Sequence, residues 1–167
     1  PGYAKSAGTI MAMAADEILM GPHSGLGPID AQIFYQGKRF SADALLEGME
    51  KIKKEVVDTG TLNRAYIPIL QGISPGELQN AENALSFAKI LVTQWLAQYK
   101  FRTWTTHSSN GQPVTSAEKE QRAKEIADRL CDHRFWKTHG RSIKIDDFER
   151  MRLKITDYSK TDRKSVV

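Results

Sequence analysis

The sequence predicts an α/β fold that contains more helix than sheet. Residues 1–35 are small, apolar and rich in glycine and alanine, with short apolar runs interrupted by Gly and Pro. Residues 41–158 show helical periodicity with charged faces. Short buried strands beside helices favour a sheet that the helices cover. With 167 residues, 40% of them apolar, the chain suits one domain with a core and is too short for two.

In the N-terminal part, glycine, proline and apolar runs divide the chain into short elements. Residues 2–5 are typical of a strand end and a turn, and residues 7–16 of a buried helix with almost no polar face. Residues 17–20 form a short buried strand in this interpretation, stopped by Gly21-Pro22, and residues 26–30 form a second tight segment.

The rest of the chain is predicted to be helical. Residues 41–58 form an amphipathic helix with Gly60 as its C-cap, and a weaker helix over 62–71 is broken by Pro68. The clearest loop is 107–112. Further helices begin where a capping residue precedes an acidic one by three positions. These starts are Ser74 with Glu77, Thr115 with Glu118, and Asp146 with Glu149. We assign 1–158 to one domain and 159–167 to a polar tail.

Composition excludes several classes of protein. The longest apolar stretch is far shorter than the ~20 residues of a membrane span. A single cysteine, Cys131, excludes a disulfide framework and a cysteine-rich zinc site, and we expect it to be a buried small hydrophobe. Metal-binding and nucleotide motifs are missing, so we expect no cofactor and no metal. The net charge of +4 permits anionic partners, but basic and acidic residues alternate, so we expect no nucleic acid partner.

The chain begins at Pro1, and we interpret it as a piece of a longer protein. Membrane association through a preceding segment is therefore compatible with the sequence. A bacterial protein that is cytoplasmic or membrane-associated is the expectation.

Ser6 is the principal candidate for chemistry. It stands between small residues, where a predicted strand turns into a predicted helix. A serine at such a junction exposes its hydroxyl on a sharp turn, and nearby backbone N–H groups at the helix start can stabilise an oxyanion. The simpler interpretation is that Ser6 only caps the helix, as most serines at this position do.

Three strings near the N-terminus resemble the ClpP-class serine peptidases. They are Ser6-Ala7-Gly8, Ala14-Ala15-Asp16-Glu17-Ile18 and Ser24-Gly25-Leu26-Gly27-Pro28-Ile29-Asp30. The resemblance is closest to the signal peptide peptidase (SppA)-like branch called serine dehydrogenase proteinase, and Trp136-x-x-His139-Gly140-Arg141 is also similar to that branch. It is specific over residues 1–33 and looser over 34–158.

The resemblance implies a crotonase-like ClpP fold, a spiral of βαβ units, of which this chain would be a helix-rich C-terminal portion. It also implies that Ser6 is the nucleophile of a serine endopeptidase acting on polypeptides, and that the Ala7 N–H supplies part of the oxyanion hole. A homo-oligomer is expected, because the helical region 75–100 carries more apolar surface than a small sheet covers. Such sites take a second oxyanion donor from an earlier glycine-rich turn, which would precede Pro1. We therefore expect this chain alone to be weakly stable or inactive.

The general base is open between lysine and histidine. His23 is more typical of a turn residue. On a helix over 41–58, Lys53 lies on the flank of the apolar face, while Lys51 and Lys54 lie further from it. The local sequence around Lys53 is also similar to the lysine context of SppA-like proteases. A Ser–Lys dyad with Lys53 is therefore favoured, provided that burial lowers the lysine pKa; a flank lysine with a solvated head is the alternative.

Other residues near the site have two interpretations each. Asp30 orients a base or binds substrate, or forms a local turn. Gly27 and Gly25 line the cleft, and Lys5 assists the nucleophile or is simply exposed. His139-Gly140-Arg141 binds an anion or fixes a turn. Two other functions remain open: a crotonase-fold acyl-CoA enzyme, and a non-catalytic oligomeric scaffold.

Overall fold

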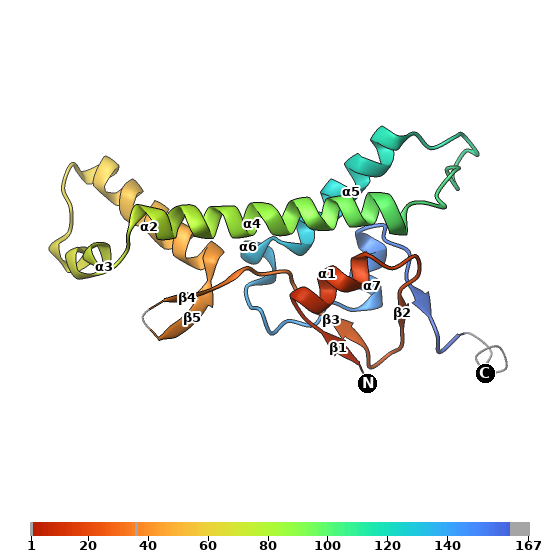
Figure 1. The fold of residues 1–167 in the computed structure, drawn as a ribbon, viewed down its shortest axis with the longest axis horizontal. Coiled ribbons are helices and arrows are strands. Elements are labelled where there is room, and N and C mark those ends of the chain that lie inside the picture. Colours follow the sequence, from red (N-terminus) through yellow and green to blue (C-terminus); the bar gives the residue numbers. More distant parts are fainter. Residues whose placement is uncertain (1, 36, 161–167) are drawn as a thin grey trace. The chain divides into compact units, whose positions relative to one another are not determined.

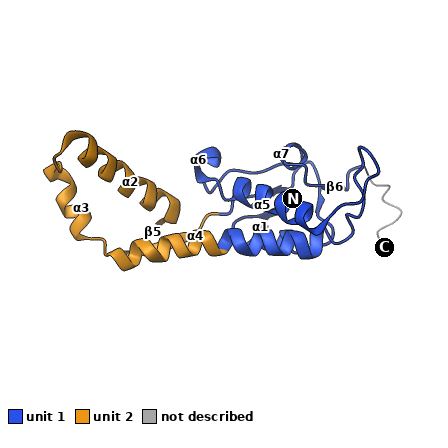
Figure 2. Ribbon diagram, turned by 90° about the horizontal axis from the view of Figure 1, so that it is seen from above, with its two compact units in different colours: residues 1–29, 88–167 blue, residues 30–87 orange. Residues whose placement is uncertain are grey.

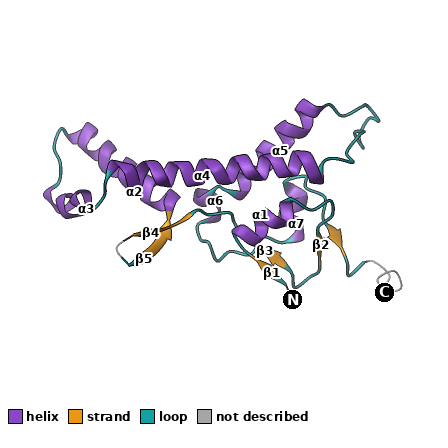
Figure 3. Ribbon diagram, in the orientation of Figure 1, coloured by secondary structure: helices purple, strands orange, loops and turns teal. Residues whose placement is uncertain are grey.

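The computed structural model describes residues 2–35 and 37–160 and contains both helices and strands (Figure 3). The strands pair into three two-stranded sheets within the described part of the chain. Contacts divide the chain into two compact units: residues 1–29 with 88–167, and residues 30–87 (Figure 2). We call these the first and the second unit and describe each by itself. The one-domain assignment of 1–158 stays a prediction, and positions 161–167 of the predicted tail lie outside the described residues.

In the first unit, strands from both ends of the chain lie side by side. β1 (Tyr3–Ala4) pairs in parallel with β3 (Gly25–Leu26), and β2 (Leu19–Met20) pairs in parallel with β6 (Thr156–Asp157). α1 (Ala7–Met13) follows β1 and lies beside this first strand pair (Figure 1). β1, α1 and β3 therefore form one β–α–β unit; the repeated spiral stays a prediction.

Helices supply most of the remaining first unit. α4 (Pro75–Trp95) enters it at residue 88 and continues as a π-helical segment, Leu96–Lys100. α5 (Ser116–Leu130), α6 (His133–Trp136) and α7 (Ile145–Arg150) follow. Their apolar faces meet in one core, whose largest fully buried side chains belong to Trp136, Phe148, Met13, Leu96 and Ile126.

The second unit contains a hairpin and helices but almost no core. β4 (Gln32–Tyr35) and β5 (Lys38–Ser41) are antiparallel. α2 (Ala42–Thr59), a 3-10 turn over Arg64–Tyr66, α3 (Ile67–Gln71) and the start of α4 follow. Among its described residues, the buried apolar side chains are those of Ala42 and Ala81 alone.

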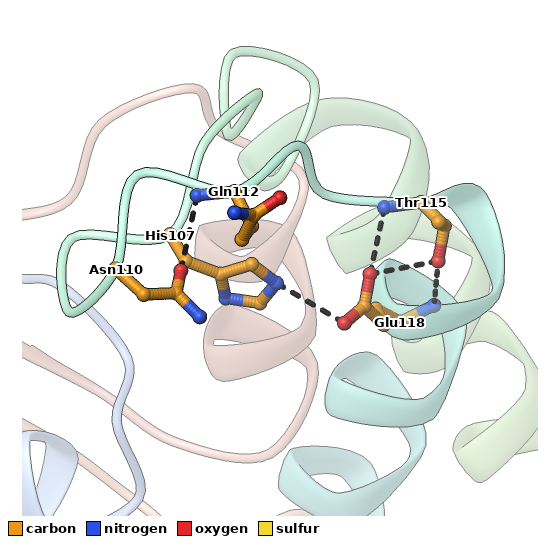
Figure 4. Close-up of polar contacts among 5 residues, drawn as sticks. All are labelled: His107, Asn110, Gln112, Thr115 and Glu118. Atoms are coloured by element: carbon orange, nitrogen blue, oxygen red, sulfur yellow. Dashed lines mark hydrogen bonds and ion pairs between the residues drawn. The ribbon is translucent and has the colours of Figure 1, made fainter.

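Two of the three predicted capping pairs and the predicted C-cap glycine are confirmed. The Thr115 and Glu118 side chains each accept from the other residue's backbone N–H, at 3.2 and 2.8 Å, and this capping box starts α5 (Figure 4). Ser74 and Glu77 make the same exchange before α4. Gly60 ends α2 with a φ of 71°, a left-handed conformation that glycine adopts without strain.

Several boundaries differ from the prediction. α1 ends at Met13 rather than 16, because the N–H groups of Ala14 and Ala15 bond three residues back and tighten the last turn. The last helix begins at Ile145 rather than after Asp146. Its N-cap is Lys144, whose N–H donates to the Asp147 carboxylate and not to Glu149. Neither the hairpin β4–β5 nor α6 was predicted.

Candidate active site

Ser6 lies on a sharp, strained turn between a strand and a helix. β1 ends at Ala4 and α1 begins at Ala7, so only Lys5 and Ser6 connect them. Ser6 has φ 49° and ψ −109°, outside the backbone regions that residues with a Cβ ordinarily adopt. Such a conformation costs about 1–3 kcal/mol, and residues held in it cluster at functional sites. A half-buried serine on a strained strand-to-helix turn matches the geometry of a nucleophile elbow.

The small residues beside Ser6 allow this turn to close. The Gly8 N–H donates to the Lys5 carbonyl at 3.0 Å, and the Ile10 N–H donates to the Ser6 carbonyl at 3.0 Å. A Cβ placed on Gly8 would lie 2.9 Å from the Ala4 Cβ, closer than such atoms approach. The sequence Ala4-x-Ser6-x-Gly8 is therefore required by packing: a larger side chain at position 8 would push the helix off the strand.

Ser6 does not act as an ordinary helix cap. A capping serine has extended backbone and accepts a hydrogen bond from an N–H of the first helical turn. Ser6 has a positive φ, and its side chain makes no capping hydrogen bond. The structure thus disfavours the simpler interpretation. The Ala7 N–H lies at the helix start, where no acceptor exists one turn earlier.

A buried threonine holds the two strands together at this turn. The Thr9 side chain is fully buried. Its hydroxyl donates to the Gly27 carbonyl at 2.8 Å, has the Ala4 carbonyl as a second acceptor at 3.2 Å, and accepts from the Gly27 N–H at 3.2 Å. Thr9 therefore fixes the carboxyl ends of β1 and β3 against the start of α1, a role that the sequence analysis missed.

Gly27 lies directly against the residue that precedes the serine. A Cβ on Gly27 would lie 2.7 Å from Lys5 Cγ and 3.1 Å from Lys5 Cα. The Lys5 ammonium in turn donates to the Gly140 carbonyl at 3.2 Å. The structure therefore brings Gly27 against the turn that holds Ser6 and Ala7. The Lys5–Gly140 hydrogen bond connects this turn to the segment that holds His139 and Gly140. The chain separation of 135 residues between Lys5 and Gly140 explains why no local pattern indicated it.

His23 occupies an exposed turn at the other end of the strand pair. The Ser24 N–H donates to the Gly21 carbonyl at 2.9 Å, which closes the turn. β1 and β3 run in parallel, with Tyr3 opposite Gly25. Ser6 follows the carboxyl end of β1, whereas His23 precedes the amino end of β3, so the pairing does not bring the two side chains together.

Asp30 is buried and engaged within the second unit. Its Oδ1 accepts from the Ser41 hydroxyl and its Oδ2 from the Gln32 amide nitrogen, both at 2.7 Å. Ser41 in turn caps α2 by accepting from the Ala44 N–H at 3.3 Å. The Asp30 carboxylate therefore supports the start of α2, and its role in orienting a base stays a prediction.

The three lysines of α2 have nearly the same surroundings. The Lys53 side chain is 72% exposed and pairs with Glu50 at 3.4 Å. Lys51 pairs with Glu47 and Lys54 with Asp58, with side chains 74% and 75% exposed. The predicted burial of Lys53 is thus not found: the helix periodicity places it on the flank of the apolar face, but no described residue of the second unit covers its ammonium. Its role as the base stays a prediction.

The Trp136–Arg141 string packs the first unit. The Trp136 indole donates to the Arg129 carbonyl at 2.6 Å, and the Arg141 guanidinium lies 5.4 Å from the Trp136 ring centre. His139, which lies between these two residues in the sequence, is half-buried. These contacts support a packing role for Trp136, while the same turn accepts a hydrogen bond from the Lys5 ammonium at the Gly140 carbonyl.

Neither a metal-binding cluster nor a membrane-spanning helix is present among the described residues. No group of three or more His, Cys, Asp or Glu side chains within residues 2–35 and 37–160 is arranged to hold a metal ion. In the same part of the chain, no helix has the length and apolarity needed to cross a membrane.

Comparison with known proteins supports the interpretation of the N-terminal segment. An uncharacterized protein of Methanocaldococcus jannaschii is 36% identical over 67 residues, which cover 40% of this chain and 22% of that relative. No solved structure matches the chain. Residues 1–74 match the family model of ClpP-like SDH-type serine proteinases. The segment that carries the Ser6 turn, Gly27 and Lys53 is therefore similar to a family of ClpP-like serine proteinases.

Proposed function

We propose that this chain carries the nucleophile of a ClpP-like serine peptidase of the SppA-like, serine dehydrogenase proteinase branch. In this proposal Ser6 is the residue that attacks the peptide carbonyl. The observation that carries the proposal is the positive φ of Ser6 at a strand-to-helix turn, without a capping bond. The match of residues 1–74 to a ClpP-like serine proteinase family supports the same reaction class. No comparable observation favours an acyl-CoA enzyme.

The reaction follows from these groups. Ser6 Oγ attacks the scissile carbonyl while a general base takes the hydroxyl proton. The carbonyl oxygen becomes an oxyanion, which accepts a hydrogen bond from the Ala7 N–H. The base then returns the proton to the leaving amine, and the acyl-enzyme remains on Ser6. Water, activated by the same base, releases the second product and restores the hydroxyl.

Two residues are candidates for the base in this proposal. Lys53 is the candidate that the sequence predicts. It can act as a base only where shielding from water lowers the pKa of its ammonium. His139 is the second candidate, supported by the hydrogen bond from the Lys5 ammonium to the carbonyl of Gly140, the next residue in its turn. Asp30, a buried carboxylate, is the candidate for orienting either group.

Hydrolysis of dye-labelled casein by the complete gene product tests these assignments. Ser6→Ala is expected to lower the rate to background. Loss of a general base lowers the rate by about 10²–10⁴-fold. Lys53→Gln is compared with Lys51→Gln and Lys54→Gln, which remove the same charge from the same helix. His139→Gln is compared with His23→Gln. Unchanged hydrolysis by Ser6→Ala would contradict the proposed function; an equal effect of a control and its test variant would contradict that base.

We also propose that the protein is a homo-oligomer in which a second copy covers the second unit. The support is that this unit leaves large apolar side chains in solvent: Phe34, Val57 and Phe87 are 74%, 76% and 63% exposed. A unit with so small a core does not bury enough apolar surface to be stable alone. Val57→Glu is expected to dissociate the oligomer in sedimentation velocity experiments. A monomeric wild-type protein would contradict this.

A further inference from the structure

The first unit contains a pocket of about 510 Å³ that the proposed reaction does not use. Its wall comes from four parts of the chain: residues 16–17 after α1, residues 100–108 after α4, Arg122 on α5, and residues 152–156 at the C-terminal end. This volume lies within the range of about 300–1,000 Å³ that is typical of small-molecule sites.

Positive charge dominates the pocket wall. Four cationic side chains, those of Lys100, Arg122, Arg152 and Lys154, face two acidic ones. Both acids already have partners. Asp16 is paired with Arg102 at 2.9 Å, and Glu17 accepts from the Thr156 hydroxyl at 2.6 Å.

Cations outnumber acids on the pocket wall, although one of them, Arg122, is paired with Glu125 at 3.0 Å. Burial lowers the pKa of the Lys100 ammonium, and the nearby Lys154 lowers it as well, while Glu17 and Asp16 act in the opposite direction. Arg152 has φ 56°, a left-handed conformation that is strained in a residue with a Cβ. Within residues 2–35 and 37–160, neither Arg152 nor Lys154 has a carboxylate partner at ion-pair distance. A bound anion would supply a counter-charge to Arg152 and Lys154.

One side of the pocket is aromatic. Trp104 and Phe101 line it, and their rings meet edge to face with centres 5.6 Å apart. His107 packs edge-on against the other side of Trp104 at 5.5 Å, and the His107–Glu118 contact of 3.1 Å ties this loop to α5 (Figure 4). The Trp104 ring is therefore held in place before any ligand arrives, and a fixed indole favours a flat or apolar ligand group.

We propose that this pocket binds a small phosphorylated molecule, whose phosphate oxygens contact Lys100, Arg152 and Lys154 and whose remaining part lies against Trp104. Arginine and lysine are the usual partners of phosphate, arginine through paired N–H groups and lysine through a compact charge. The site is separate from the nucleophile elbow and does not depend on the peptidase proposal.

Isothermal titration calorimetry of the complete gene product tests the site, with ADP and inorganic pyrophosphate as probes at low ionic strength. ADP is expected to bind saturably and more tightly than pyrophosphate, because only ADP reaches the aromatic wall. Lys100→Gln and Lys154→Gln are each expected to weaken ADP binding about tenfold or more, since each removes a hydrogen bond to a charged group. Lys124→Gln, which removes an exposed lysine of α5 outside the pocket, is the matched control.

The result of the ADP titration does not depend on the peptidase proposal. Ser6→Ala is expected to bind ADP like the wild type, so failure of the peptidase proposal leaves this test intact. Lys154 is exposed, so its variant remains informative if Lys100→Gln fails to fold. Two results would overturn the proposal: no heat of binding from either probe at millimolar concentration, or equal weakening by Lys124→Gln and the lining variants. Pyrophosphate binding as tightly as ADP would overturn the role of Trp104.

Discussion

Ser6→Gly is expected to make the protein more stable while removing its proposed nucleophile. Glycine adopts φ 49° without a Cβ clash, so the substitution relieves the strain of the elbow. Ser6→Ala is the matched comparison, because it also removes the hydroxyl but keeps the Cβ and therefore the strain.

The size of the effect follows from two opposing contributions. Relief of the strained backbone is worth about 1–3 kcal/mol. The greater freedom of glycine in the unfolded chain takes back roughly 0.5–1 kcal/mol. Ser6→Gly should therefore have a free energy of unfolding about 1 kcal/mol above that of Ser6→Ala.

Urea denaturation followed by tryptophan fluorescence measures this difference. The three tryptophans of this 167-residue chain, Trp95, Trp104 and Trp136, lie in the first unit with Ser6, so their fluorescence reports the unit that carries the strain. With a denaturant slope of about 2 kcal/mol per molar, the urea midpoint should rise by roughly 0.5 M. A midpoint for Ser6→Gly equal to or below that of Ser6→Ala would show that the elbow is not strained, and the structural argument for a nucleophile would be lost.

Three further results are expected. Gly27→Ala should slow the reaction of Ser6 with a fluorophosphonate several-fold, because its Cβ would displace Lys5, and equal rates of adduct formation by mass spectrometry would contradict this. Gly48→Ala, whose Cβ meets nothing within 4 Å, should leave that rate unchanged and raise the free energy of unfolding by up to about 1 kcal/mol in urea titrations. Backbone and side-chain hydrogen bonds from Thr115 lower the pKa of the Glu118 carboxyl below its ordinary 4.5. That carboxylate therefore stabilises the fold above pH 4.5, and its contribution is lost as the pH falls through the lower folded pKa. Glu118→Gln should accordingly reduce the drop in the urea midpoint below pH 5, and a drop as steep as in the wild type would contradict the assignment.

Local chemistry explains which parts of the fold could be predicted. The capping pairs at Ser74 and Thr115 and the glycine at position 60 act within one helical turn, so short strings of sequence are enough to identify them. The inward positions of α5 follow from helical spacing, and Ala123 and Ile126 on that face are both buried. The position of Ser6 at a strand-to-helix junction has the same local origin.

Features that depend on distant contacts could not be predicted. The β4–β5 hairpin leaves Phe34 in solvent, so its pattern lacks the alternation of a half-buried strand. Helical periodicity placed Lys53 beside an apolar face but does not say whether another element covers that face. The turn at His139 reaches the elbow only through the Lys5–Gly140 contact, and Thr9 is significant only because Gly27 lies next to it.

The most direct test of the account is the site at which the complete gene product reacts with a fluorophosphonate, mapped by peptide mass spectrometry. The account predicts one adduct, on the peptide that contains Ser6, and its loss in Ser6→Ala. An adduct on another serine, or no adduct on a protein that hydrolyses casein, would contradict the assignment of Ser6 as the nucleophile.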